Sequence, residues 1–372
     1  MKSNKGIDIP LLTATILLVV VGIIMVFSSS YTYALSNTGD GAHYLKRVLM
    51  WAALGMMALT FCSVCPYRIW ARFSNLIMLG ALVLLVIVLT SAGKEVNYAQ
   101  RWIEVGGITI MPSELAKAAV IFYMAATMEK NKHRIKTFRD GCVPHLLIGG
   151  IVFALVYQQP DFSTGLIIVS IMMIMLFVSG VNMIHFALLF ATGVGSVAAA
   201  LGYIFVSGQG YKARRLIAYL DPWADPMDSG LQTVQSLLAI GSGGIAGRGI
   251  GKSIQKHLYL PEPQNDFIFA IIGEEVGFFG ATLVLLLFAI FIWRGACIAM
   301  SAPDMFSCLT ATGITSMVAI QVIVNVGVAT SLLPVTGIPL PFISYGGSAL
   351  LVLMACTGIM LNISKYTGIQ GG

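Results

Sequence analysis

Four carboxylates interrupt an otherwise apolar stretch, LPEPQNDFIFAIIGEEVGFFG, which covers residues 260–280. One of them, Asp266, lies where a proline-containing turn becomes a run long enough for a membrane helix. A carboxylate at that boundary could cap the helix by accepting its first amide hydrogens. It could instead take a proton from the hydroxyl of a substrate, as a general base does. Asn265 could cap the helix equally well, so both interpretations of Asp266 stay open.

Two further carboxylates, Glu274 and Glu275, lie inside the apolar run. Glu274 follows Asp266 at a distance of about 12 Å along a helix. Charged side chains in a membrane helix are costly, so they face the bundle interior or a wet cavity and have a partner. The expected partner is Lys117, the only Lys or Arg well inside a predicted span. A buried ion pair is the favoured interpretation of Glu275, whereas Glu274 could equally line a cavity.

A third polar group lies in MPSELAK, residues 111–117, at the start of another apolar run. Ser113 is a suitable N-cap, and Glu114 and Lys117 are three residues apart on one helix face, where they could pair with each other. A lysine at this depth, one turn below the membrane surface, is also well placed to bind a phosphate.

Two segments break the chain at membrane depth. QQPDFSTG, residues 158–165, places Asp161 between a proline and a glycine, and LLPVTGIPLPFISYGGS, residues 332–348, contains Ser344 among three prolines and several glycines. Non-helical backbone at this depth is tolerated only where protein or a water-filled cavity covers it. The two breaks therefore predict a polar cavity at the outer face, with ordinary loops as the alternative.

Glycines and cations are combined in GSGGIAGRGIGK, residues 241–252. This segment is not a dinucleotide-binding fingerprint, because no strand precedes it. Its backbone amides, with Arg248 and Lys252, could nevertheless hold an anion such as a pyrophosphate. Arg214 and Arg215, in the earlier YKARR run, could do the same or lie against lipid headgroups.

The composition indicates which elements position these residues. Hydrophobic residues make up 57% of the chain, charged residues make up 10% and the mean hydropathy is +0.87. Soluble domains contain about 25% charged residues, so the chain is predicted to be a polytopic membrane protein. The net charge of +6 then reflects membrane topology rather than nucleic-acid binding. The six cysteines show neither a disulfide framework nor the spacing of a metal site.

The expected fold class is an all-α bundle of about ten transmembrane helices. A large extracytoplasmic loop, about 207–265, separates spans seven and eight, with short helices expected in RRLIAYLDPW and LQTVQSLLAIG. Lysine and arginine are concentrated in alternate short connections, which predicts that both termini are cytoplasmic. The expected spans are 10–29, 45–65, 74–92, 113–129, 142–158, 164–180, 184–206, 266–293, 306–330 and 345–364.

The run from RRLIAYLDPW to GEEVGFFG, residues 214–280, resembles the SEDS family (shape, elongation, division and sporulation) of bacterial cell-wall polymerases. The likeness is greater to its FtsW/SpoVE branch than to RodA. MPSELAK, QQPDFSTG and TGIPLPFISYGGSALL resemble the other family signatures, in the expected order. The resemblance covers nearly the whole chain and implies a single SEDS-type membrane domain over residues 1–372.

The resemblance implies a peptidoglycan glycosyltransferase that polymerises lipid II on the outer face of the cytoplasmic membrane. The essential carboxylate of the family falls on Asp266. The resemblance implies that Asp266 deprotonates the 4-hydroxyl of the acceptor GlcNAc. The hydroxyl oxygen would then attack the anomeric carbon of the undecaprenyl-pyrophosphate-linked glycan, with inversion to a β-1,4 link. The candidates for binding the leaving pyrophosphate are Lys117, Arg214, Arg215, Arg248 and Lys252. The residues in family motifs that would shape the cavity are Glu114, Asp161, Glu274 and Ser344.

The implied partners are a class B penicillin-binding protein, which is the transpeptidase, and other division or sporulation proteins, with no nucleic acid. The family leaves room for a divalent cation near the pyrophosphate, but no ligand set in the sequence fixes one. Ala349 stands where the family often has a second serine, which leaves the choice between a division role and a sporulation role open.

The alternative function is a lipid II transporter, although the two halves of the chain show no matched pair of interrupted helices. A pure scaffold would leave the buried carboxylates without a purpose.

Overall fold

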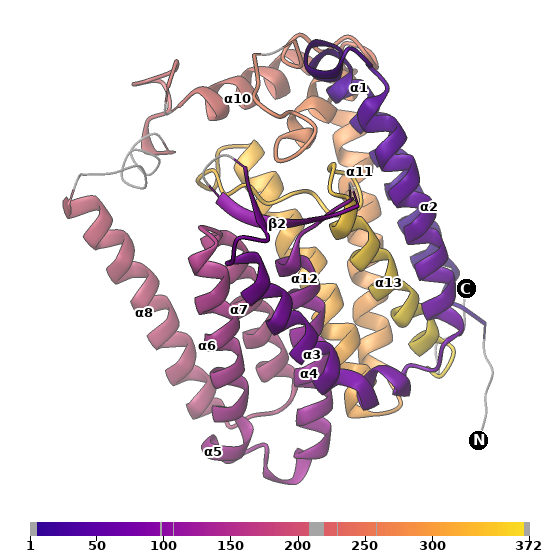
Figure 1. The fold of residues 1–372 in the computed structure, drawn as a ribbon, viewed down its shortest axis with the longest axis vertical. Helices are drawn as coiled ribbons and strands as arrows, with labels where there is room; N and C mark the ends of the chain where they lie inside the picture. Colours follow the sequence, from indigo (N-terminus) through magenta and orange to yellow (C-terminus); the bar gives the residue numbers. More distant parts are fainter. Residues whose placement is uncertain are drawn as a thin grey trace.

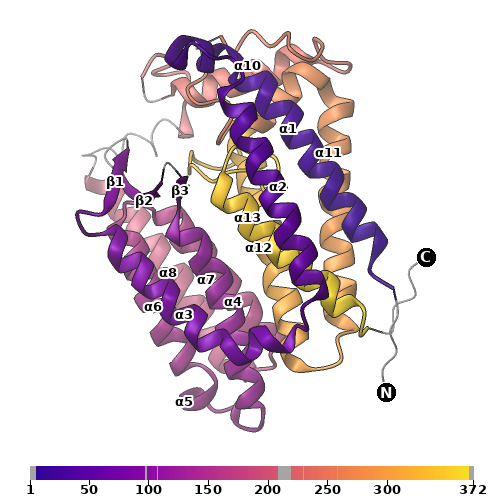
Figure 2. The same ribbon diagram turned by 45° about the vertical axis from the view of Figure 1, so that its right-hand side comes forward.

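The computed structural model describes residues 6–96, 99–106, 108–207, 219–228, 230–257 and 259–367. Long helices run roughly parallel or antiparallel in one bundle (Figures 1 and 2). The start of helix α1 (Ile9–Thr38) and the end of helix α13 (Gly347–Ser364) lie at the same end of the bundle, where the amide of Asp8 donates to Ser364 Oγ at 3.1 Å. The described segments between α8 (Met183–Ser207) and α11 (Ile268–Met300) cover the opposite end (Figure 1). We call this opposite end the loop end.

Ten long helices of the described residues follow the ten predicted spans. The all-α polytopic fold predicted from hydropathy is therefore confirmed, with helix ends that differ from the expected ones by several residues. The helices are α1 (Ile9–Thr38), α2 (His43–Val64), α3 (Arg68–Val88), α4 (Pro112–Lys130), α6 (Val143–Gln158), α7 (Phe162–Val178), α8 (Met183–Ser207), α11 (Ile268–Met300), α12 (Met305–Ala329) and α13 (Gly347–Ser364). Two short elements, η1 (Lys132–Arg134) and α5 (Phe138–Gly141), connect α4 to α6.

Seven of the described helices are long and apolar enough to cross a membrane: α1, α2, α3, the combined α5–α6 helix, α11, α12 and α13. Helix α7 and the apolar part of α8 are shorter. Helix α4 differs because it contains charged residues at both ends, including Glu114 and Lys117. It packs against α3, α7 and α12, so protein rather than lipid surrounds much of its surface.

Local sequence explains several helix ends. Asp8 caps α1 by accepting a hydrogen bond from the amide of Leu11 at 3.0 Å. Asp304 caps α12 in a reciprocal capping box with Ser307. Helix α1 ends at Gly39, which has φ +72°, a left-handed conformation that glycine adopts at little cost.

A three-stranded antiparallel sheet lies at the loop end, between α3 and α4 (Figure 2). Its strands are β1 (Gly93–Val96), β2 (Ala99–Val105) and β3 (Ile108–Ile110), in the order β1-β2-β3. The sequence analysis did not predict this sheet, because each strand is too short for its alternation to stand out. Arg101 on β2 donates to the carbonyl of Gln159 at 3.2 Å and also to that of Pro160, so the sheet contacts the break between α6 and α7.

The loop between α8 and α11 contains α10 (Leu231–Gly243), which confirms the helix expected in LQTVQSLLAIG. Half of the other segment in which a helix was expected, RRLIAYLDPW, lies outside the described residues. Helix α10 packs on α11 and α12, and Ser236 donates to the carbonyl of Ala329 at 2.7 Å. The described part of this loop is thus attached to the end of the bundle (Figure 1).

Candidate active site

Asp266 is half-buried and lies immediately before α11. The N-cap position of α11 is Phe267, so the structure does not assign the cap to Asp266. The carbonyl of Asp266 accepts a hydrogen bond from Asn325 Nδ2 on α12 at 2.8 Å. Its Oδ2 atom lies 3.5 Å from the place that a Cβ would occupy on Gly337, so the carboxylate faces the segment between α12 and α13.

The segment between α12 and α13 also forms hydrogen bonds with the two residues before Asp266. Ser344 Oγ donates to the carbonyl of Asn265 at 2.6 Å and accepts from the amide of Leu340 at 2.8 Å. The amide of Tyr345 donates to the carbonyl of Gln264 at 2.9 Å. Hydrogen bonds to three successive carbonyls therefore hold the backbone at Asp266, which limits how far its carboxylate can move.

Glu114 and Lys117 form a buried ion pair on α4, with Lys117 Nζ 2.9 Å from Glu114 Oε1. The Lys117 side chain is only 2% exposed. This contact confirms that the two residues pair with each other. The expectation that Lys117 pairs with Glu274 or Glu275 is wrong, because both of those carboxylates take partners from the segment before Asp266.

A cavity of about 10 Å³ lies beside Glu114. A space of this size holds about one water molecule. Glu114, Gln321 on α12 and Ser344 supply its polar lining, and Gln321 Oε1 is buried with no hydrogen-bond partner. Helix α4, helix α12 and the broken segment before α13 therefore meet around a small space that contains polar groups.

Asp161 occupies the break between α6 and α7. Its Oδ1 atom accepts from the amide of Thr164 at 3.3 Å and caps α7, while its Oδ2 atom is buried without a hydrogen-bond partner. Pro160, the preceding residue, has φ +29°. The chain break predicted from QQPDFSTG is present, and the Asp161 carboxylate keeps one acceptor oxygen free of hydrogen bonds.

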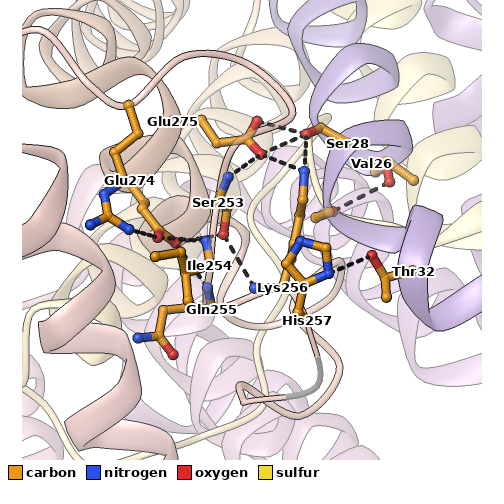
Figure 3. A network of polar contacts seen from close by, with 12 residues as sticks. Val26, Ser28, Thr32, Ser253, Ile254, Gln255, Lys256, His257, Glu274 and Glu275 are labelled. Carbon is orange, nitrogen blue, oxygen red and sulfur yellow. Dashed lines mark hydrogen bonds and ion pairs between the residues drawn. The ribbon is translucent and has the colours of Figure 1, made fainter.

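Glu274 is fully buried and binds the segment that precedes Asp266 (Figure 3). Its carboxylate accepts from Ser253 Oγ at 2.5 Å and from the amide of Ile254 at 2.8 Å. Arg248 Nη1 lies 3.4 Å from Glu274 Oε1. Glu274 and Arg248, which the sequence analysis gave separate roles, are therefore neighbours.

Glu275 is equally buried and binds three groups (Figure 3). Ser28 Oγ on α1 lies 2.7 and 2.6 Å from its two carboxylate oxygens, and the amide of Ser253 lies 3.3 Å from Oε1. Its ionic partner is Lys256, with Nζ 3.0 Å from Oε1 and a side chain only 5% exposed. Sequence reasoning missed Lys256, and the requirement of a buried carboxylate for a cation was the signal that could have found it.

The basic candidates differ in exposure. The Arg248 side chain is 37% exposed and Lys252 is also exposed, whereas Arg214 and Arg215 lie outside the described residues. The amides of Arg248 and Gly249 donate to carbonyls of α11 at 3.0 and 2.9 Å. These two amides hold the loop on α11, so they do not form the anion cradle that was considered from the sequence.

The described residues contain no group of three or more His, Cys, Asp or Glu side chains that could hold a metal ion. The six cysteines are free thiols, and three of them, Cys62, Cys142 and Cys356, are buried.

The family model of the cell cycle proteins FtsW, RodA and SpoVE matches residues 9–369, nearly the whole chain. The chain belongs to the FtsW, RodA and SpoVE family. The SEDS resemblance carried by MPSELAK, QQPDFSTG and the Asp266 region is thereby confirmed.

Relatives in the family share much of this sequence. Stage V sporulation protein E of Bacillus subtilis is 43% identical over 362 residues, which cover 97% of this chain and 97% of that protein. The probable peptidoglycan glycosyltransferase FtsW of Geobacter metallireducens is 37% identical over 367 residues, which cover 98% of this chain and 96% of that protein. Both relatives bear names from the division and sporulation branch to which the sequence pointed.

Solved structures of the family share the fold. One chain comes from a peptidoglycan synthase complex that coordinates polymerization and crosslinking; it has a TM-score of 0.79 and 25% identity, with 97% of this chain and 98% of that chain covered. The rod shape determining protein RodA of Thermus thermophilus has a TM-score of 0.71 and 26% identity, with 98% of each chain covered. The arrangement of the bundle is thus that of known family members.

Proposed function

We propose that Asp266 is the general base with which this chain, a peptidoglycan glycosyltransferase of the FtsW, RodA and SpoVE family, polymerises lipid II. The family match and the FtsW relatives support the activity. One observation carries the assignment of Asp266. Its carboxylate lies just before the start of α11, and hydrogen bonds from Asn325, Ser344 and Tyr345 hold the backbone there.

The proposed reaction is a direct displacement. Asp266 takes the proton of the acceptor GlcNAc 4-hydroxyl, and the oxygen then attacks the anomeric carbon of the lipid-linked donor chain. The bond from that carbon to the pyrophosphate oxygen breaks, and undecaprenyl pyrophosphate leaves with the electron pair. Attack opposite the leaving group inverts the anomeric carbon and produces a β-1,4 link. A base on a fixed backbone contributes because it needs little reorganisation before the proton moves.

Positive charge near the leaving pyrophosphate would stabilise the transition state. We assign this role to the exposed side chains of Arg248 and Lys252 and to Lys117, with Arg214 and Arg215 as further candidates from the undescribed segment. Lys117 differs from the others because it is buried and paired with Glu114, so a phosphate would have to share it. Glu114 and Ser344 line the small cavity and would shape it rather than react. Asp161 and Glu274, which were also expected to shape it, are not among its lining residues and would instead hold the α6–α7 break and the segment before Asp266.

A transpeptidase that cross-links the new strand is the partner we infer, specifically a class B penicillin-binding protein. Support comes from the structural match to a chain of a complex that coordinates polymerization and crosslinking. We further infer one membrane domain over residues 1–372, with cytoplasmic termini and an extracytoplasmic loop end. The distribution of lysine and arginine supports this orientation.

The test is polymerisation of lipid II by the reconstituted chain and its transpeptidase, with the product measured on a gel. Asp266→Asn keeps the size of the side chain, and we expect it to lower the rate by about 10²- to 10⁴-fold. Asp40→Asn is the matched control, because Asp40 is a partly exposed aspartate at the same end whose carboxylate pairs with Lys46 and accepts from the amide of Ala42, away from Asp266. It should polymerise at the wild-type rate.

Normal polymerisation by a folded, partner-bound Asp266→Asn protein would show that the base lies elsewhere. If the wild-type chain makes no polymer while an active polymerase does so under the same conditions, lipid II transport becomes the function to test.

A further inference from the structure

A buried ion pair closes a loop of the chain around Asp266. Lys256 and Glu275 lie 19 positions apart in the sequence, and their charged atoms are 3.0 Å apart. Asp266 lies almost midway between them in the sequence. Because the pair joins the two sides of this loop, it removes conformational freedom from the segment that contains the proposed base.

The closure extends to a third element. Ser28 on α1 donates to the Glu275 carboxylate at 2.6 Å and lies 3.4 Å from Lys256 Nζ (Figure 3). Thr32, one turn further along α1, lies 3.2 Å through its Oγ1 atom from His257 Nδ1. Helix α1, helix α11 and the segment before Asp266 are therefore joined at one buried point, Ser28 with Glu275 and Lys256, and the Thr32–His257 contact lies beside it at the exposed surface.

Glycines allow the backbones to meet there. Gly247 has φ +77°, and a Cβ on it would lie 2.4 Å from the carbonyl oxygen of Glu275. Gly277, just after Glu275, has φ +69°, and a Cβ there would lie 2.3 Å from the amide nitrogen of Gly247. The loop therefore approaches α11 at backbone contact distance next to the buried pair.

Stability alone is a weak reason for such a pair. Two charges lose much hydration when they are buried, and their attraction often repays little more than that loss. Breaking the pair, in contrast, leaves one charge unpaired in the interior. Glu275, Lys256 and Ser28 are better explained by the geometry they impose, since they join an early span to the segment that enters α11 through Asp266.

We propose that Glu275, Lys256 and Ser28 form a clamp that positions Asp266 for proton transfer. The proposal rests on the proposed function of Asp266 as the base. The three residues act through Asp266 and are positioning residues, because none of them needs to touch the substrate. Loss of the clamp should slow the chemical step more than it weakens substrate binding.

The first experiment measures kcat and KM for lipid II polymerisation by Glu275→Gln and by Lys256→Met in the complex with the transpeptidase. We expect kcat to fall about ten- to a hundredfold, as small misplacements of a catalytic group do, with KM unchanged within about twofold. The matched control is Asp8→Asn, which breaks the buried Asp8–Arg294 pair between the same two helices. It should lower thermal stability without a selective loss of kcat.

The second experiment restores the clamp by a different bond. Thr32→Cys and His257→Cys, introduced together into the Glu275→Gln protein, place two thiols where the side chains now touch. Linking them with a reversible bis-methanethiosulfonate reagent should recover most of the lost kcat, and a reductant should remove the gain. Each single-cysteine protein, treated alike, controls for reaction at the native cysteines.

Several outcomes would overturn the clamp. A wild-type kcat in folded Glu275→Gln would do so, as would a cross-link that forms in full without raising kcat. If Glu275→Gln prevents folding, Ser28→Ala takes its place, because it keeps the Lys256–Glu275 ion pair and removes the hydrogen bond from α1 to Glu275. A wild-type kcat in the Ser28→Ala protein would equally reject the proposal. Absence of polymer from the wild-type chain would instead reject the proposed function itself.

Discussion

Lys117 is among the largest fully buried side chains in the described part of the protein. Its charge is balanced by Glu114 one turn away on α4, as that of Lys256 is balanced by Glu275. An isolated charge in a low-dielectric interior costs several kcal/mol or more. These residues therefore have to be considered as pairs, and a substitution of one member tests the other as well.

We predict that Lys117→Met destabilises the protein by about 3–5 kcal/mol, because it leaves the Glu114 carboxylate buried without a counter-charge. The double substitution Lys117→Met with Glu114→Gln should recover much of that loss, since it removes both charges. Thermal unfolding of the purified protein in detergent measures the difference. The control is Lys46→Met, which breaks the exposed Lys46–Asp40 pair and should leave the thermal unfolding nearly unchanged, because solvent screens an exposed pair. Equal losses in the single and double Lys117 proteins would contradict this account.

Helix α11 is bent at a defined residue. Gly277 has φ +69° and ψ −166°, which no residue of a regular helix has. The amides of Phe278 and Phe279 donate to the carbonyls of Gly244 and Ile245 at 3.0 and 3.3 Å, instead of to carbonyls of their own helix. The turn at residues 244–249 therefore completes the hydrogen bonding of the bent helix, and the two elements form one unit.

The close approach of this turn gives a matched pair of substitutions. Gly247→Ala and Gly244→Ala both place a side chain on backbone at positive φ, a region that costs about 1–3 kcal/mol for a residue with a Cβ. The two positions differ in their surroundings. A Cβ on Gly247 would lie 2.4 Å from the carbonyl oxygen of Glu275 on α11, whereas a Cβ on Gly244 would meet nothing within 4 Å. We expect Gly247→Ala to lower both thermal stability and polymerisation clearly more than Gly244→Ala. Equal effects of the two substitutions would mean that the contact with α11 contributes nothing.

The whole molecule presents two different ends to the two sides of the membrane. The sheet, α10 and the broken segment before α13 lie at the loop end, whereas η1 and α5 lie at the other end with several exposed cations (Figure 1). Since short connections rich in lysine and arginine stay in the cytoplasm, the end with η1 is expected to face inwards.

We predict that a membrane-impermeant maleimide labels Lys94→Cys in intact cells. Lys136→Cys, between η1 and α5, should be labelled only after the cells are opened. Both positions are exposed, so accessibility differs only by the side of the membrane. The wild-type chain reports the background from its native cysteines. Labelling of Lys136→Cys in intact cells would reverse the orientation and would place the proposed active site on the wrong side for a glycan exported from the cell.

The spans were predictable from the sequence because the signal is local: about 20 apolar residues are enough to recognise each one. The breaks at QQPDFSTG and before α13 were predictable for the same reason, since proline and glycine disrupt a helix wherever they occur. Asp266 could be selected because its family motif surrounds it in the sequence.

Other features depended on the tertiary structure. Lys256 lies 19 positions from Glu275, and Ser28 lies 247 positions from it. No local pattern links such residues, so only the packing of α1, α11 and the intervening loop decided which charges meet. The same reason explains why Glu275 was assigned to Lys117 instead of Lys256. It also explains why the bend at Gly277, whose free amides bind the turn at residues 244–249, went unpredicted. Hydropathy determines which segments enter the membrane, whereas the choice of partner for each buried charge is made by the fold.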